Sequence, residues 1–238
     1  MECDNFRADV RRWGWARSLF VRVMSQLRRH TGLRVYRVNV RPLITRAPAP
    51  NSLTGITLRV VKPEELLRAA IDPELDLHPD FVQDAIARGD TAFGAFESDR
   101  LVGYTWRTFA SAPHVDGLWV RVDRPYQYSY KAFTRPSHRR RHIHVAITFF
   151  ADIHLLERGC TAEVGFVDIS NFASLAVADF LGRRRIGYAG HVNWFGSRIS
   201  FRTPGVRKIG VGIFERNPSA RPESSAAAGK PAFPEFEA

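Results

Sequence analysis

Two apolar segments in the middle of the chain most constrain its fold. Residues 92–97 and 101–109 are largely apolar, and the polar residues 98–100 join them. So short a connection allows only an antiparallel hairpin, because parallel strands need a crossover of a dozen or more residues. More strands are expected at 118–122 and 126–134. Successive strands of this kind exclude a doubly wound parallel sheet.

The segments around these strands alternate between helix and strand patterns. In chain order we expect a strand at 56–60, helices from 63 and at 79–88, a long helix at 138–158, a strand at 162–167, a helix at 171–181 and closing strands at 188–200. A mixed sheet with helices on both of its faces accommodates this order. The sequence therefore predicts an α/β fold with a central mixed β-sheet flanked by helices.

The positive charge of the chain is concentrated near its N-terminus. The 238 residues carry a formal net charge of +11, and residues 1–50 hold eleven arginines against three acidic residues, which leaves a local charge of +8. Such a balance favours acidic partners in general, including nucleic acid, an anionic membrane surface or a phosphorylated ligand. No recognised nucleic-acid module accompanies these charges, so a nucleic-acid partner is not expected.

Residues 7–30 predict an amphipathic helix. Apolar residues recur every three to four positions with arginines between them, and Thr31-Gly32 provides a stop. Two interpretations stay open. The helix lies on an anionic membrane surface with Trp13 and Trp15 at the interface, or it packs on the domain or on a partner subunit.

Composition divides the chain into three parts. Residues 1–50 hold the basic helix and most of a proline- and alanine-rich linker at 42–54, residues 55–216 form the α/β domain, and residues 217–238 predict a disordered tail.

Cysteine content and hydropathy indicate the compartment. With two cysteines, Cys3 and Cys160, there is no disulfide framework. No long apolar region follows the basic N-terminal residues, and no stretch of ~18 apolar residues would span a membrane. We expect a cytoplasmic protein, placed at the inner membrane face if the helix at 7–30 binds lipid.

Two motifs stand around the long helix and the helix after it. Residues 133–144 read Phe-Thr-Arg-Pro-Ser-His-Arg-Arg-Arg-His-Ile-His, and Asn171-Phe-Ala-Ser-Leu precedes Leu181-Gly-Arg. These segments resemble the GNAT family of acyltransferases, in which a strand ends in V-x-P-x-x-R-G-x-G-x-G and a later helix carries N-x-x-S-L followed by L-G-F. The resemblance covers roughly residues 56–203.

The resemblance implies a co-substrate, acetyl-CoA or another acyl-CoA. In the family, backbone N–H groups at the start of the long helix bind the pyrophosphate, and the strand edge before it pairs with the pantetheine arm. The cofactor-binding residues implied here are Phe133, Thr134, Arg135, Arg139, Arg140, Arg141, His142, Ile143, His144, Asn171 and Ser174.

This chain departs from the family motif at the glycines. Arg140, His142 and His144 occupy those positions, while Arg139 matches the family's arginine. The new side chains either hold phosphate through charge-assisted hydrogen bonds or obstruct the close approach of the backbone. In addition, Ala178 stands where many members carry a tyrosine that protonates the leaving thiolate.

The expected reaction is attack of an amine on the thioester, which needs positioning, an oxyanion donor and a proton acceptor. A strand N–H near Phe133 or Thr134 is the expected oxyanion donor. Candidate catalytic side chains are Glu163, Asp168 and Tyr130. Alternatively, Glu163 and Asp168 are surface or capping carboxylates, and Asp168 shapes the turn before the helix that Asn171 caps. The alternative for Tyr130 is packing against a helix.

The histidines of the motif do not predict a metal site. His138 and His142 are spaced to share a helix face, yet no nearby carboxylate or cysteine completes a ligand set. The leading hypothesis is an N-acyltransferase that transfers an acetyl or other acyl group to an amine acceptor, such as a small molecule. The rival is a catalytically degenerate GNAT-fold binding or scaffold protein, favoured by the replaced glycines and the missing tyrosine.

Overall fold

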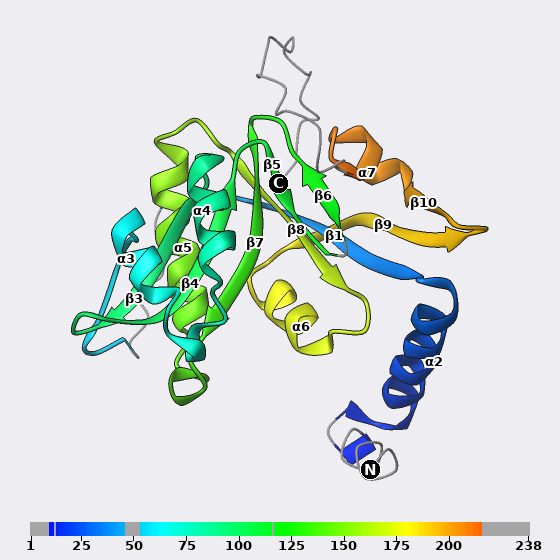
Figure 1. Ribbon diagram of the computed structural model, residues 1–238, viewed down its shortest axis with the longest axis horizontal. Helices are drawn as coiled ribbons and strands as arrows, with labels where there is room; N and C mark the ends of the chain where they lie inside the picture. Colours follow the sequence, from blue (N-terminus) through cyan, green and yellow to red (C-terminus); the bar gives the residue numbers. More distant parts are fainter. Residues whose placement is uncertain (1–9, 12, 46–52, 116, 216–238) are drawn as a thin grey trace.

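The protein is built on one large mixed sheet (Figure 1). The computed structural model describes residues 10–11, 13–45, 53–115 and 117–215. The strands of this sheet, in spatial order, are β10 (Ser197–Arg202), β9 (Arg184–Trp194), β1 (Arg34–Pro42), β8 (Ala162–Asp168), β7 (Tyr126–Thr134), β4 (Arg100–Thr108), β3 (Thr91–Glu97) and β2 (Ile56–Val60). Within the described residues, β7 and β8 form a parallel pair and the other neighbours are antiparallel.

The predicted hairpin is confirmed as β3 and β4. Their turn is tight because Ser98 adopts the left-handed conformation, with a φ of 53°. Both strands are buried on both faces, as expected for strands covered from two sides.

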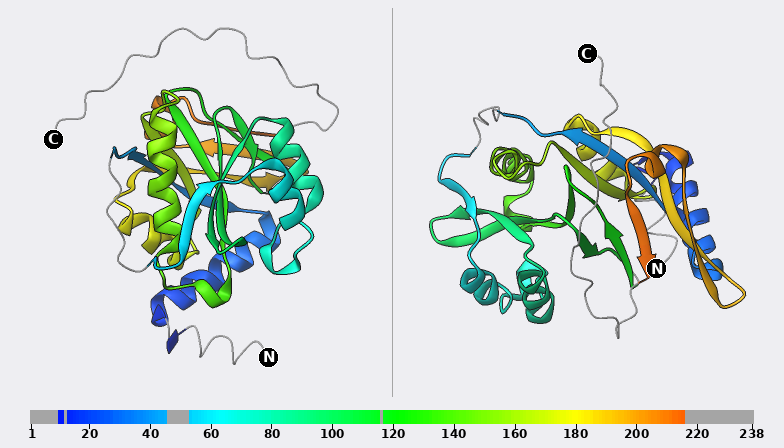
Figure 2. Two further views of the ribbon diagram at one scale, coloured as in Figure 1. Left: turned by 90° about the vertical axis from the view of Figure 1, so that its left-hand side faces the viewer. Right: turned by 90° about the horizontal axis from the view of Figure 1, so that it is seen from above.

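Helices cover both faces of the sheet, as predicted. On one face lie α3 (Pro63–Ala69) and α4 (Pro79–Ala87), joined by the short helix η1 (Pro73–Leu75). The other face carries α5 (Ile143–Leu156) and α6 (Phe172–Phe180). Figure 2 shows the single helix α5 and the α3–α4 pair on opposite sides of the strands. Each face has its own hydrophobic core, one with Leu66 and Val82, the other with Ile143 and Ile147.

A small second sheet extends the α3–α4 side of the core. It consists of β5 (Ser111–Pro113), β6 (Leu118–Arg121) and β11 (Gly212–Glu215). Val120 and Ile213 are buried in the same core as the helices. The sequence analysis expected a strand near 118–122 but not this separate sheet. The short helix α7 (Pro204–Lys208) packs on β9.

The N-terminal segment contributes a strand that the sequence analysis did not expect. Arg34–Pro42 forms β1, which lies between β8 and β9 and pairs with both. The analysis had placed the first strand at Ile56. Residues assigned to a basic extension therefore lie near the centre of the sheet, because alternate positions such as Val38 and Val40 are buried in the core.

Two predicted helices differ in their limits. The N-terminal helix α2 runs over Trp15–Thr31 and ends at Gly32, with a φ of 62°, so the predicted stop is confirmed. The long helix begins at Ile143 rather than at 138, because His142 is in the left-handed conformation and 136–138 form the short helix η2. The predicted tail at 217–238 and most of the predicted linker lie outside the described residues.

None of the helices in the described part of the chain combines the length and the hydropathy needed to span a bilayer.

Candidate active site

The strands β7 and β8 separate part-way along their length. They pair from Tyr126 and Ala162 as far as Ser129 and Gly165. Beyond this point β7 pairs with β4 on one side and β8 with β1 on the other. The separation leaves an opening in the sheet, where one edge of β7 has no strand partner among the residues that the structure describes.

A β-bulge lies on β7 beside this opening. Thr105 faces Ala132 and Trp106 faces Tyr130, so Lys131 has no partner on β4. Its φ is 33°, outside the extended region. Bulges bend a strand and redirect its backbone groups, and they occur often at functional sites. The sequence carried no signal for this bulge, and the expected oxyanion donor was placed two or three residues later.

Ion pairs attach the loop between β7 and α5 to the rest of the domain. Arg135 is buried, donates from Nε to the Leu101 carbonyl oxygen at 2.8 Å, and pairs with the carboxylates of Asp72 and Glu74. The His138 ring contacts Glu97 at 3.1 Å. Arg135 therefore anchors the loop to η1 and turns away from any ligand in the opening.

Arg141 also forms an ion pair within the protein, since its Nη1 lies 3.2 Å from the Glu97 carboxylate. The neighbouring Arg139 and Arg140 are exposed, and the Nε of Arg139 lies 3.4 Å from the Thr134 carbonyl oxygen. These two side chains carry positive charge at the end of β7.

The loop keeps a backbone shape that favours glycine. Arg140 has a φ of 65° and His142 a φ of 56°. Both stand at positions where the GNAT motif has glycine, and a non-glycine residue in this region costs about 1 kcal/mol or more. The backbone is thus left-handed at two positions that carry large side chains.

Helix α5 begins at this loop without a side-chain cap. Its first amides, from Ile143 to Val145, have no carbonyl partner within the helix, and the helix dipole adds positive potential there. The His142 ring stacks on Phe180 at the end of α6, with ring centroids 5.9 Å apart. The loop, the start of α5 and the end of α6 therefore meet at one place, which is suited to an anion.

A buried cluster of charged side chains lies next to the opening between β7 and β8, on the face of the sheet that α5 covers. Arg41 binds Asp152 through two hydrogen bonds of 2.6 and 2.7 Å and binds Glu163 at 2.9 Å. Arg183 donates to Glu163 at 2.6 Å, and Arg107 lies 3.4 Å from the same carboxylate. Three guanidinium groups thus surround two carboxylates.

This cluster determines the protonation of Glu163. Burial alone would raise the pKa of this carboxyl group, but the guanidinium groups of Arg183, Arg107 and Arg41 hold its pKa well below its usual range. Burial lowers the pKa of Arg107 to about 10, which still leaves it charged at neutral pH. A carboxylate held by three arginines fits a structural anion better than a proton acceptor.

His144 stands at the first turn of α5, near the same arginines. Burial, and after it the charges of Arg183 and Arg107, lower the pKa of His144 to about 4. The imidazole is therefore neutral at pH 7. The sequence analysis named His144 as a cofactor contact, but it gave no reason to expect Arg107 or Arg183 beside it.

Tyr130 faces the α4 side of the sheet. Its hydroxyl donates to Asp90 Oδ2 at 2.6 Å, and its ring packs against Phe81. Burial raises the pKa of Tyr130, and the charge of Asp90 raises it further. The Tyr130 ring also stacks on the buried Tyr128. Tyr130 thus packs against helix α4, which is one of its two expected roles. Phe133 lies on the same face, stacked on Tyr104.

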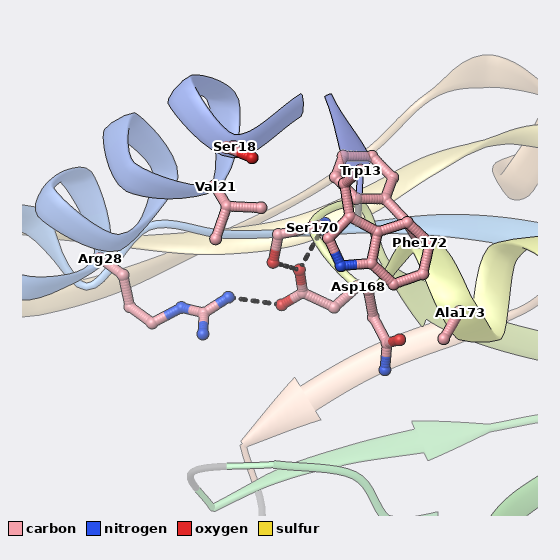
Figure 3. A pocket seen from close by; sticks show the side chains of 9 residues that line it. Trp13, Ser18, Val21, Arg28, Asp168, Ser170, Phe172 and Ala173 are labelled. Atoms are coloured by element: carbon pink, nitrogen blue, oxygen red, sulfur yellow. Dashed lines mark hydrogen bonds and ion pairs between the residues drawn. The ribbon is translucent and has the colours of Figure 1, made fainter. Parts of the chain in front are cut away.

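Asn171, Ser174 and Asp168 lie at the far end of β8. Asn171 caps α6 as expected, since its Oδ1 accepts from the Ser174 amide at 3.1 Å. Asp168 accepts from the amide of Ser170 at 2.8 Å and pairs with Arg28 of α2 at 2.5 Å. Asn171 and Asp168 border a cavity of about 440 Å³ between α2 and the start of α6, and Figure 3 shows Arg28 reaching across it to Asp168.

A second cavity, of about 530 Å³, lies on the other side of the sheet near the bulge. Its lining comes from the segment between α3 and α4, including Asp76 and His78, from Phe81 of α4, and from Lys131 of β7. The Lys131 ammonium group lies 3.0 Å from Asp76. This cavity therefore adjoins the opening at the bulge, and its rim carries an acidic group.

The structure brings the expected residues into separate groups. Thr134, Arg139, Arg140, His142, Ile143 and His144 gather around the open end of β7. Arg135 and Arg141 anchor the loop, and Glu163 belongs to the buried cluster. Among the described residues, no three histidine, cysteine or acidic side chains are grouped closely enough to hold a metal ion.

No protein-family model and no curated protein matches the sequence. Solved structures do match. The fold is similar to that of GNAT acetyltransferases. A GCN5-related N-acetyltransferase from Kribbella flavida is 14% identical, with a TM-score of 0.46, and the match covers 74% of this chain and 64% of that one.

Two further structures show the same likeness. An acetyltransferase of the GNAT family from Novosphingobium aromaticivorans is 14% identical, with a TM-score of 0.45 and coverage of 68% and 66%. AAC(6')-Iy, in complex with the bisubstrate analogue CoA-S-monomethyl-acetylneamine, is 18% identical, with a TM-score of 0.42 and coverage of 61% and 95%. The chain thus spans about two thirds of the first two structures, 64% and 66%. Each of these matches is a likeness of fold at low sequence identity.

Proposed function

We propose that this chain is an N-acyltransferase that transfers an acetyl or other acyl group from acyl-CoA to an amine. The observation that carries the proposal is the parting of β7 and β8 beyond Ser129 and Gly165, next to an uncapped helix start. The free edge of β7 offers backbone groups to an extended ligand that carries amides, and the helix start offers N–H groups to its phosphates.

Arg139 and Arg140 supply the charge for the phosphates in this proposal. Both are exposed beside the start of α5, whereas Arg135 and Arg141 are bound to acidic residues of the protein. The left-handed backbone at Arg140 and His142 leaves the turn shaped as a glycine-rich phosphate loop would be. A pyrophosphate there would meet backbone N–H groups and guanidinium groups together.

The acceptor amine would enter from the cavity on the α4 side. Asp76 is exposed and pairs with Lys131, and in this proposal the ammonium group of the acceptor would replace Lys131 as its partner. The exposed His78 lies in the same lining as a candidate proton acceptor. The bulge at Lys131 places redirected backbone groups between this cavity and the opening, so its amide is our candidate oxyanion donor. Of the side chains first named as catalytic, Glu163 and Tyr130 would serve as structural groups here.

The alternative is a binding protein on the same fold. It is favoured by Ala178, which is fully buried where a thiolate-protonating tyrosine would stand. A binding protein would retain affinity for CoA or for an amine without turnover.

Calorimetric titration with acetyl-CoA and with desulfo-CoA tests the proposal. We expect micromolar binding that weakens about 10-fold in Arg139→Ala, as for the loss of one charge-assisted contact. Arg121→Ala is the matched control, since Arg121 is also exposed but lies on β6. Turnover with a panel of amines then separates the two candidates.

The Arg140→Gly variant distinguishes the two roles that arginine can play in the loop. Tighter binding would mean that the side chain obstructs the phosphates, and weaker binding that it holds them. No binding of acetyl-CoA, desulfo-CoA or longer acyl-CoA to the wild type would reject acyl transfer.

A further inference from the structure

Helix α2 turns its apolar side away from the rest of the protein. Four exposed apolar residues follow each other at every fourth position and form the α2 stripe: Trp15, Leu19, Val23 and Leu27. The buried residues of this helix are Ser18 and Met24, a small polar side chain and one apolar one. Amphipathic helices on globular proteins normally bury their apolar stripe. The exposed one is therefore available to a different surface.

The hairpin of β9 and β10 exposes two further aromatic rings. Phe195 at its tip is 92% exposed and Trp194 is 60% exposed. Phe195 also adopts the left-handed conformation, with a φ of 46°. Hairpin tips favour glycine, asparagine and aspartate at such positions. Neither the turn nor the core accounts for an apolar pair here.

The α2 stripe and this hairpin tip lie on the same side of the molecule. The end of α2 adjoins the hairpin, because a Cβ at Gly32 would fall only 2.3 Å from the side-chain amide nitrogen of Asn193. Figures 1 and 2 show α2, in blue, and the β9–β10 hairpin, in yellow to orange, projecting from one side of the sheet. Two separate elements on one side of the sheet thus carry exposed aromatic and aliphatic residues.

The charge of this region indicates which partner fits it. Helix α2 contains four arginines and no acidic residue, and Arg22 and Arg29 are exposed along one edge of the stripe. A second copy of the chain would set these like charges against each other. An anionic lipid surface would instead accept the apolar groups between its headgroups and the arginines beside them.

We propose that α2 and the tip of the β9–β10 hairpin dock on an anionic membrane surface. The helix would lie in the plane of the headgroups, with the α2 stripe, about 18 Å long, inserted beside Trp194 and Phe195. Basic side chains add about 1 kcal/mol each near such a surface, so binding depends on both lipid charge and salt. This docking is independent of acyl transfer and holds whether or not the protein binds acyl-CoA.

Co-sedimentation of the full chain with lipid vesicles tests the proposal. Vesicles of phosphatidylcholine are compared with vesicles that also contain phosphatidylserine, at low and at high salt. We expect binding to the anionic vesicles that falls with salt. The double variant Leu19→Ser, Val23→Ser should weaken partitioning at least ~10-fold, and Phe195→Ser should weaken it several-fold.

The matched control is Leu67→Ser, Ile153→Ser, which changes two apolar residues of similar exposure on α3 and α5. It should bind as the wild type does. Circular dichroism confirms that each variant is folded. Equal binding to both vesicle types, or wild-type binding of the stripe and hairpin variants, would overturn the proposal. So would a wild-type dimer that the stripe variant converts to monomer, since the stripe would then be a self-interface.

Discussion

Arg41 on β1 and Glu163 on β8 are direct neighbours across the sheet, and their side chains form a buried ion pair of 2.9 Å. They are 122 residues apart in the sequence. The pair joins the N-terminal strand to the strand that borders the opening. The position of that border therefore depends on a segment far from it in the chain.

Replacing Arg41 tests this connection. In Arg41→Met, both Asp152 and Glu163 lose a buried partner, and we expect the free energy of unfolding to fall by about 3–5 kcal/mol. Urea unfolding followed by circular dichroism measures it. Arg121→Met removes the exposed pair with Asp123 and should change stability by less than about 1 kcal/mol. Equal effects in the two variants would contradict a structural role for the buried cluster.

A methyl group at Gly190 would test the position of β1. The Cβ of an alanine there would fall 2.0 Å from the Arg34 carbonyl oxygen, so β1 and β9 would have to separate. We expect Gly190→Ala to lower the free energy of unfolding by about 3 kcal/mol. Gly212→Ala is the control, because its nearest atom would be 3.8 Å away. If both variants unfold at the wild-type urea concentration, β1 is not packed against Gly190.

The backbone of the loop between β7 and α5 predicts opposite effects on stability for substitutions of its adjacent residues Arg139 and Arg140. Arg140 has a φ of 65°, so Arg140→Gly should raise the free energy of unfolding by about 0.5 kcal/mol by relieving strain. Arg139 has a φ of −65°, and Arg139→Gly should lower it by a similar amount, because glycine loses more entropy on folding. Thermal unfolding of both variants, side by side, provides the comparison. A change of the same sign in both would count against the left-handed conformation at Arg140.

His144 gives the protein a specific pH dependence. Its folded pKa of about 4 lies below the ordinary value of ~6.5, so the unfolded chain binds more protons between these values. Its contribution to stability is complete above pH ~6.5 and is lost as the pH falls toward 4, by roughly 3 kcal/mol in all. The variant His144→Asn should lose less stability than the wild type over that range. Urea unfolding at several pH values measures the difference, and parallel curves would refute the assignment.

The local elements followed from the sequence because their signals are local. The hairpin of β3 and β4, the stop of α2 at Gly32 and the Asn171 cap each depend on residues within a few positions of one another. The order of these elements predicted a mixed sheet with helices on both faces, and motifs at 133–144 and 171–182 indicated the GNAT fold. Apolar spacing was enough for the elements and their order, and the resemblance to GNAT rested on the residues of the two motifs.

The tertiary structure alone decided which residues meet at the site. Lys131 lies in a bulge because β7 has one more residue than β4 at this point of their pairing. The bulge therefore depends on both strands. Glu163 lies in a buried cluster of charges because β1 and the turn between α6 and β9 bring Arg41 and Arg183 to it. Pairing between distant strands is set by the packing of the whole core, and no single segment encodes it. The sequence therefore specified the elements and the loop motif, while long-range packing assigned Arg135 to an anchor and Arg139 and Arg140 to the open end of β7.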